Sequence, residues 1–240
     1  MNLENTGKKY KYELRFLLNK YIFNSSAGIV PMKSSFSDLK KLVPFIQQFV
    51  DFDNPDGYSK IDNTILIMEH FQFDATKNSV KKGSTSQREY ARIDRENKKK
   101  DVMHCEINYE NYKNNLLKTF DEHYKKIENY KKNLIKELNL KCNSVFKVAF
   151  FIEDTTPLGC VDIDTRKIVY PIFCRELITS YEKADNLDYI FSFNEVGSEK
   201  HVLFTNKSSI SELKSNSLCS ENTNLIPWVP QILAFNCRID

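Results

Sequence analysis

The stretch Thr64 to Lys77, which reads T-I-L-I-M-E-H-F-Q-F-D-A-T-K, is the segment on which an interpretation of the fold depends. It begins with an apolar run, Ile65 to Met68, that is typical of a buried β-strand. Polar residues and phenylalanines follow. Because successive side chains of a strand point in opposite directions, one face is predicted to carry Ile65, Ile67, Glu69, Phe71 and Phe73, and the other Leu66, Met68, His70, Gln72 and Asp74.

Four polar side chains in so β-prone a segment make it the best candidate for a functional site. They are Glu69, His70, Gln72 and Asp74. A buried carboxylate or imidazole needs a hydrogen-bonding partner, a metal ion or a proton to offset its removal from water. The segment therefore predicts either a functional site or a buried pair, Glu69 and His70, that is satisfied by its neighbours or by a helix terminus.

The segments around this strand predict a mixed α/β fold. Helical patterns occupy residues 8–23, 35–50 and 171–183, and the longest periodic pattern predicts one long helix over about 107–139. Further strands are predicted over residues 144–154, 187–195 and 201–206. This order predicts a single central sheet flanked by helices. No segment has the length and polarity of an interdomain linker, so residues 1–240 are expected to form one domain.

Composition argues against several classes of protein. The chain of 240 residues, with 17 Phe and 12 Tyr, has the apolar content of a folded protein, and its net charge of +3 is too small to identify a partner. Six cysteines occur without a Cys-x-x-Cys pair, which argues against a zinc ribbon and favours free thiols in a reducing cytoplasm. Neither a signal-peptide core nor an apolar run of membrane-spanning length is present, so no membrane association is expected.

A basic segment follows the focal strand. From Ser86 the spacing predicts a helix with a row of arginines on one face, and a Gly-Ser loop precedes it whose backbone N–H groups could hold an oxyanion. The residues predicted to contact the phosphates of DNA are Lys81, Lys82, Arg88, Arg92 and Arg95. The alternative interpretation of this row is a solvated helix face, which Glu89, Asp94 and Glu96 partly neutralise.

Carboxylates at the start, middle or end of predicted strands could gather at one edge of the sheet. They are Asp62, Glu69, Asp74, Glu153 and Asp154. Carboxylate oxygens suit Mg²⁺ or Mn²⁺, and such a centre can activate water for attack on a phosphate. We predict Asp62, Glu69 and Asp74 as metal ligands. Glu153 and Asp154 have an alternative interpretation as acids that cap the following turn, at Thr155 and Thr156.

Pro55-Asp56, or Asp62 alone, followed by Glu69 in a strand resembles the motif of the restriction-endonuclease-like nucleases of the PD-(D/E)XK type. That motif is a Pro-Asp pair, then an Asp or Glu, one residue and a Lys. The resemblance covers roughly Asp56 to Lys82. It implies that the two acids and the lysine hold a metal ion and orient the attacking water.

The chain departs from this motif because Phe71, not a lysine, stands two residues after Glu69. If the resemblance holds, Lys77 or Lys82 takes the role of the lysine. Alternatively, His70 and Asp74 form the working pair, and Glu69 bonds to a neighbouring helix. The predicted catalytic residues are accordingly Glu69, His70, Asp74 and Lys77.

Two functions from different classes follow from these patterns. The first is a metal-dependent nuclease or nuclease-fold protein acting on DNA, in phage defence or restriction. The second is a non-catalytic module or subunit of a larger complex that binds a partner protein through the Tyr-rich helix over 107–139, and the missing lysine favours it. His123, beside the apolar stripe of that helix, is interpreted as a hydrogen-bonded boundary residue rather than a ligand.

Overall fold

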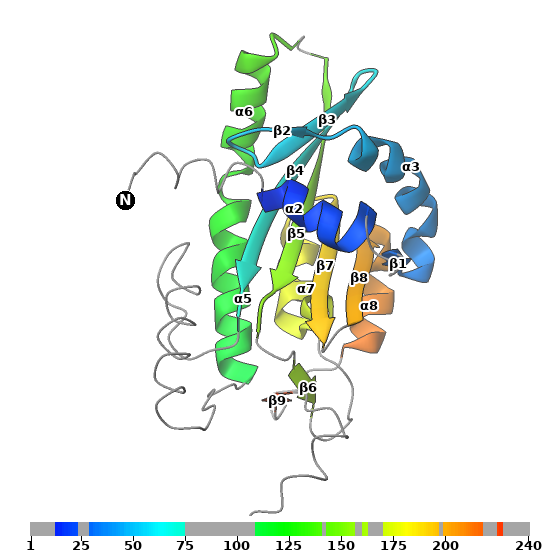
Figure 1. Cartoon of the computed structure of the whole chain (residues 1–240), viewed down its shortest axis with the longest axis vertical. Coiled ribbons are helices and arrows are strands. Elements are labelled where there is room, and N and C mark those ends of the chain that lie inside the picture. The colour runs from blue at the N-terminus through cyan, green and yellow to red at the C-terminus, as the bar shows by residue number, and fades with distance from the viewer. Residues whose placement is uncertain are drawn as a thin grey trace, which may run out of the picture.

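Seven strands form one mixed β-sheet, and the predicted single sheet flanked by helices is confirmed. The computed structural model describes residues 13–23, 29–74, 109–140, 143–156, 160–162, 170–196, 199–217 and 225–227. The strands lie in the order β1-β8-β7-β5-β4-β3-β2 (Figure 1). Their bounds are β1 Ile29–Pro31, β2 Val50–Asp51, β3 Gly57–Ile61, β4 Thr64–Phe73, β5 Val145–Asp154, β7 Tyr189–Val196 and β8 Glu199–Asn206. A separate two-stranded sheet pairs β6 (Cys160–Asp162) with β9 (Leu225–Pro227).

The focal segment forms β4, an inner strand of the sheet between β5 and β3. It pairs in parallel with β5 over its whole length, from Thr64 opposite Val145 to Phe73 opposite Asp154, and β5 pairs in parallel with β7. Parallel neighbours need crossover connections that cover the sheet, so strands at this position are buried on both faces. This burial explains the continuous apolar run with which β4 begins.

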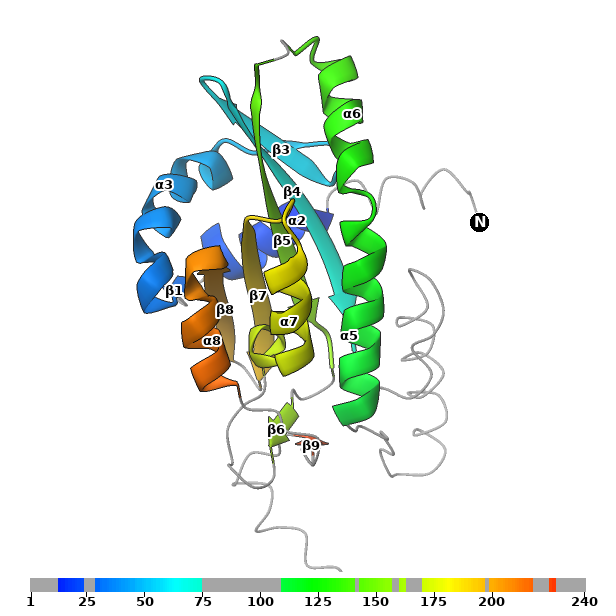
Figure 2. The same ribbon diagram turned by 180° about the vertical axis from the view of Figure 1, so that it is seen from behind.

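Helices cover both faces of the sheet. One layer contains α2 (Glu13–Leu18), the π-helical turn η1 (Asn19–Phe23) and α3 (Phe36–Gln47); α2 crosses in front of the sheet in Figure 1. The other layer contains α5 (Tyr109–Tyr124), α6 (Ile127–Glu137), α7 (Arg175–Lys183) and α8 (Ile210–Asn216), and Figure 2 shows α7 and α8 in front of the strands. Short 3₁₀ turns, η2 (Lys33–Ser35), η3 (Pro171–Phe173) and η4 (Lys207–Ser209), precede α3, α7 and α8.

The predicted alternation of β4 is confirmed by its packing. Ile65, Ile67, Phe71 and Phe73 pack in the apolar layer beneath α5, α6 and α7. Leu66 and Met68 pack in the layer beneath α2 and α3. Glu69 therefore faces α5 and α6, whereas His70 faces α2.

The helix predicted over 107–139 is divided into α5 and α6 by a turn at Lys125 and Lys126. At this turn the N–H of Lys126 donates to the carbonyl of His123, three residues back, rather than to the residue four back. Proline and glycine, the usual local signals for a break, are absent from residues 109–137. The local sequence therefore contains no signal that predicts the turn between α5 and α6.

The turn between β3 and β4 fixes where those two strands meet. Asp62 and Asn63 form the turn, and Asp62 has a positive φ of 53°, which aspartate tolerates better than most residues. The β3–β4 ladder ends at Gly57 opposite Met68, whereas β4 continues to Phe73. Beyond Met68, β4 therefore leaves β3 behind, and the polar residues of the focal segment lie in this part.

Phe150 offers a test of the core. Its ring is fully buried in β5 and packs edge-on against Phe71 and Phe120, at centroid distances of 5.5 and 5.6 Å. We expect Phe150→Ala to lower the free energy of unfolding by about 3–5 kcal/mol, because it removes buried surface and leaves a cavity. The matched control is Val145→Ala, at an exposed position of the same strand, with an expected change within about 0.5 kcal/mol. Urea denaturation measures both, and equal losses would contradict the assigned packing.

Candidate functional site

Glu69 lies at the centre of a polar cluster on the α5–α6 face of β4. Its side chain is 6% exposed, and both of its oxygens have partners. Oε1 accepts a hydrogen bond from the Tyr130 hydroxyl at 2.5 Å and lies 2.6 Å from Nδ1 of His123. Oε2 accepts the backbone N–H of Asp56 at 3.3 Å. We call Asp56, Glu69, His123 and Tyr130 the Glu69 cluster.

Asp56 joins this cluster because the β3–β4 ladder ends beside it. Continuing the ladder by one residue past Gly57 and Met68 brings Asp56 opposite Glu69. Strand pairing stops at that point, and the Asp56 carboxylate replaces the missing strand by accepting the backbone N–H of His70 at 2.7 Å. The two acids of the Pro-Asp…Glu pattern are thus brought together by the hairpin.

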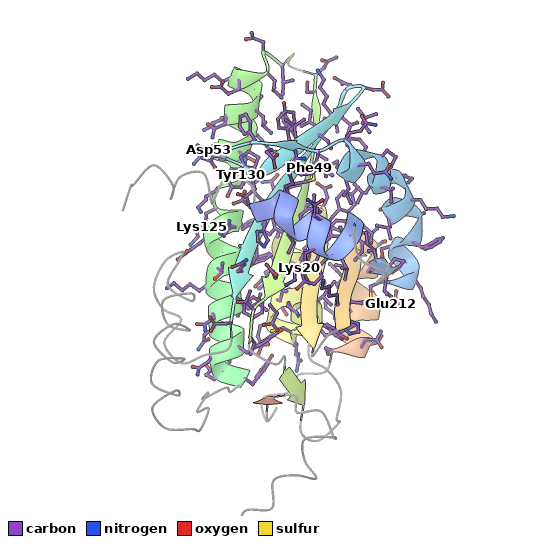
Figure 3. The ribbon with its side chains drawn as sticks, in the orientation of Figure 1. Lys20, Phe49, Asp53, Lys125, Tyr130 and Glu212 are labelled. Carbon is purple, nitrogen blue, oxygen red and sulfur yellow. The ribbon has the colours of Figure 1, made fainter. Side chains whose placement is uncertain are left out.

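The partners of Glu69 on the helices are held in fixed orientations. The imidazole of His123 stacks on Phe71, with centroids 4.8 Å apart and an interplanar angle of 22°, and the side chain is 18% exposed. Tyr130 is buried, and burial together with the negative charge of Glu69 raises the pKa of its hydroxyl. The hydroxyl therefore stays protonated and donates to the carboxylate. Figure 3 shows Tyr130 on the side of the sheet where Lys125 marks the α5–α6 turn.

A second cluster lies on the opposite face, beneath α2. There Glu153 accepts the side-chain amide of Gln72 at 2.9 Å and lies 3.3 Å from Nε2 of His70. The turn η1 adds Tyr21, whose hydroxyl is 3.4 Å from Glu153, and Lys20, whose Nζ is 3.7 Å away (Figure 3 labels Lys20). We call these five residues the Glu153 cluster.

The partners of Glu153 keep its carboxylate ionised. Burial by itself raises the pKa of this group, but hydrogen bonding from His70 and Gln72, with the charge of Lys20, brings it below the ordinary value. The Glu153 cluster is thus a buried carboxylate matched by donors from β4 and η1. Both clusters include residues of β4, but they lie on opposite faces of the sheet.

A third group of polar side chains lies where β4 and β5 end. Asp74 and Asp154 are both buried there, and Asp154 accepts the N–H of Thr156 at 2.9 Å. Burial raises the pKa of Asp154 to about 7; the charge of Asp74 adds to the rise, and hydrogen bonds from Thr156 and Tyr112 oppose it. The interpretation of Asp154 as a strand-end acid that caps its turn is confirmed, whereas Glu153 belongs to the cluster beneath α2.

The three predicted metal ligands do not lie together. Asp62 is exposed in the β3–β4 turn, seven residues before Glu69, and Asp74 follows Glu69 by five residues. At about 3.3 Å per residue these separations are roughly 23 and 16 Å along the strand. No group of three or more His, Cys, Asp or Glu side chains that could hold a metal ion occurs within the described ranges.

The predicted catalytic residues are also distributed over different places. Glu69 and His70 face opposite layers, and Asp74 lies at the end of β4. The alternative in which Glu69 bonds to a neighbouring helix is what the geometry contains, because its partners are His123 of α5 and Tyr130 of α6. The predicted catalytic Lys77 and the predicted DNA contacts lie outside the described residues; those contacts are Lys81, Lys82, Arg88, Arg92 and Arg95.

Sequence reasoning did not place Tyr130 or His123 beside Glu69. Tyr130 could have been found from the spacing of three and four between Ile127, Tyr130 and Leu134, all of which are buried. His123 is a hydrogen-bonded boundary residue as interpreted, but its partner is on a distant strand and has no local signal.

Comparison of the chain with protein-family models, curated proteins and solved structures finds no match. In the part of the chain that the structure describes, no helix combines the length and apolar character needed to cross a membrane.

The raised pKa of Asp154 predicts how stability depends on pH. The folded pKa of about 7 lies above the ordinary value of 3.8, so the folded state binds the proton more tightly than the unfolded chain. This contribution is complete below about pH 4 and is lost as the pH rises towards 7, at up to about 1.4 kcal/mol per pH unit. Asp154→Asn should remove this slope.

Urea denaturation of wild type and Asp154→Asn at several pH values between 4 and 8 measures the effect. The control is Asp53→Asn, an exposed aspartate in the loop before β3. A difference between wild type and Asp154→Asn that does not change with pH would contradict the prediction.

Proposed function

We propose that the chain is a metal-dependent nuclease that acts on DNA, with Asp56 and Glu69 as its central acids. The observation that carries the proposal is that Asp56 and Glu69 lie side by side where β4 separates from β3: the N–H of Asp56 donates to Glu69, and the Asp56 carboxylate accepts the N–H of the next residue, His70. Asp56 and Glu69 are the two acids of the Pro-Asp…Glu pattern. The site therefore lies at the α5–α6 turn rather than along β4 towards Asp74.

The acids of the Glu69 cluster fit a magnesium or manganese ion. Mg²⁺ keeps several of its waters and is commonly bound by one or two carboxylates together with substrate phosphates, so a third protein acid is not required. In the described part of the chain, two short hydrogen bonds occupy Oε1 of Glu69, whereas Oε2 receives a single long one, from Asp56. Oε2 of Glu69 and the half-buried Asp56 carboxylate would hold the ion. When bound, it would lower the pKa of a water and stabilise charge on the phosphate.

The protein's own groups have separate roles in this proposal. Tyr130 and His123 hold the Glu69 carboxylate, and the backbone N–H of His70 holds that of Asp56. Lys125 and Lys126 are exposed at the turn immediately after α5, beside His123, where cations can contact the phosphate backbone. Lys81, Lys82, Arg88, Arg92 and Arg95, outside the described residues, remain predicted DNA contacts from the sequence. We place the protein in the cytoplasm, in phage defence or restriction, as part of the same proposal.

The alternative is a non-catalytic protein-interaction module or subunit. It is favoured by the number of donors that already satisfy Glu69, because a carboxylate with three hydrogen bonds is stable without an ion. The tyrosines would not form its contact surface, since Tyr109, Tyr112 and Tyr130 are buried against the sheet. A partner would meet the polar side of α5 and α6 instead.

Cleavage of DNA tests the two acids directly. Plasmid and single-stranded DNA are incubated with the full chain in Mg²⁺ or Mn²⁺. We expect wild type to cleave, and Asp56→Asn and Glu69→Gln each to lower the rate by at least about 100-fold, because each removes a charge that the ion needs. Chelation by EDTA should abolish cleavage.

Two matched variants show whether the site is correctly placed. Asp62→Asn changes an exposed turn acid, and Asp74→Asn changes a buried acid at the far end of β4; both should retain cleavage. Cleavage that survives Asp56→Asn and Glu69→Gln would overturn the assignment. Absence of cleavage by the folded wild type on both substrates would favour the interaction module.

The affinity for DNA should depend on salt. Each phosphate contact releases counterions, so the logarithm of the binding constant should fall linearly with the logarithm of the salt concentration. Replacing Lys125 and Lys126 together by alanine should reduce this slope by about two, measured by fluorescence anisotropy on a labelled duplex. Lys40→Ala with Lys41→Ala on α3 is the control, and an equal change in both pairs would contradict the proposed DNA surface.

A further inference from the structure

We infer that His123 is a positioning residue, which fixes the Glu69 carboxylate so that one of its oxygens is left for a divalent cation beside Asp56. The inference rests on the proposed function and adds a residue from α5 to a site whose acids come from β4 and the loop before β3. It concerns the orientation of a carboxylate, so it can be measured through cation binding without any cleavage.

The two oxygens of Glu69 have unequal surroundings. Oε1 is 2.6 Å from Nδ1 of His123 and 2.5 Å from the hydroxyl of Tyr130, which are short distances for hydrogen bonds. Among the described residues, Oε2 receives only the backbone N–H of Asp56, at 3.3 Å. A carboxylate oxygen accepts about two hydrogen bonds through its lone pairs, so Oε1 is saturated and Oε2 keeps capacity for a cation.

Of the two groups that hold Oε1, His123 is the one fitted to control its orientation. The final torsion of a glutamate side chain is soft, so the carboxylate turns unless its oxygens are held from different directions. The His123 ring is itself immobilised by stacking on Phe71, two residues along β4 from Glu69. β4 thus carries both the Glu69 carboxylate and Phe71, whose ring orients the His123 imidazole that contacts this carboxylate.

The position of His123 in the chain supports this role. It lies in the last turn of α5, and its carbonyl accepts the N–H of Lys126 in the turn that separates α5 from α6. Its side chain is 18% exposed, compared with 6% for Glu69, so the ring forms the boundary between the buried carboxylate and solvent. The ring therefore separates Oε1 from solvent, and Oε2, on the side of Asp56, is the oxygen left for a cation.

The experiment measures Mn²⁺ affinity by isothermal titration calorimetry on the full chain. His123→Ala should weaken binding by about 10- to 100-fold, the usual effect of losing a group that orients a ligand. His123→Asn, which keeps a nitrogen donor close to the Nδ1 position, should bind with nearly wild-type affinity. His201→Ala is the control. His201 lies on β8, is partly buried and packs against Tyr170. Circular dichroism and thermal unfolding establish that each variant is folded.

The outcomes separate the inference from the proposed function. If His123→Ala binds Mn²⁺ as wild type and His201→Ala do, while Asp56→Asn and Glu69→Gln lose binding, the role of His123 is overturned and the proposed site stands. Binding by His123→Asn as weak as that of a folded His123→Ala would also overturn it. If Asp56→Asn and Glu69→Gln bind as wild type does, or wild type binds no Mn²⁺, the proposed function fails and the inference fails with it.

Discussion

Burial of the Glu69 carboxylate beneath α5 and α6 is the constraint on which this side of the molecule depends. A charged group in an apolar layer is stable only where donors replace the water that it has lost. Those donors come from the loop before β3, the last turn of α5 and the start of α6. The start of β3 and the turn between the two helices must therefore both lie at the level of Glu69, which links the β3–β4 hairpin to the crossover connection.

Two adjacent residues of β4 organise opposite faces of the sheet. Glu69 has donors from the helices on one side, and His70 on the other side contacts Glu153, which also lies close to Lys20 and Tyr21 of the turn η1. Asp56 connects the two sets, because its N–H bonds Glu69 and its carboxylate accepts the N–H of His70. The position at which β3 stops pairing thus determines the local geometry on both faces.

The alternation along β4 and the mixed α/β architecture could be predicted from the sequence, because strand periodicity and apolar runs are local properties. Asp62, Glu69 and Asp74 are predicted to gather, but they lie apart. The alternation and the rise per residue of a strand explain why, because they place the three side chains at different positions along β4 and just beyond its ends. Pairing of Asp56 with Glu69 depends on the register of the β3–β4 hairpin. The contacts of His123 and Tyr130 depend on how the helices pack, which no spacing within the chain specifies.

The edges of the sheet limit what the protein can do with other copies of itself. Its outermost strands are very short, three residues in β1 and two in β2, and β1 ends in Pro31, which has no N–H to donate. Val30 and Val50 are exposed on these strands, so each edge presents an apolar side chain. Each edge strand is nevertheless too short to form an extended set of backbone hydrogen bonds with another chain. A sheet with long inner strands and such short edge strands exposes few backbone groups for pairing, so it has little capacity to grow by edge-to-edge addition of a second copy.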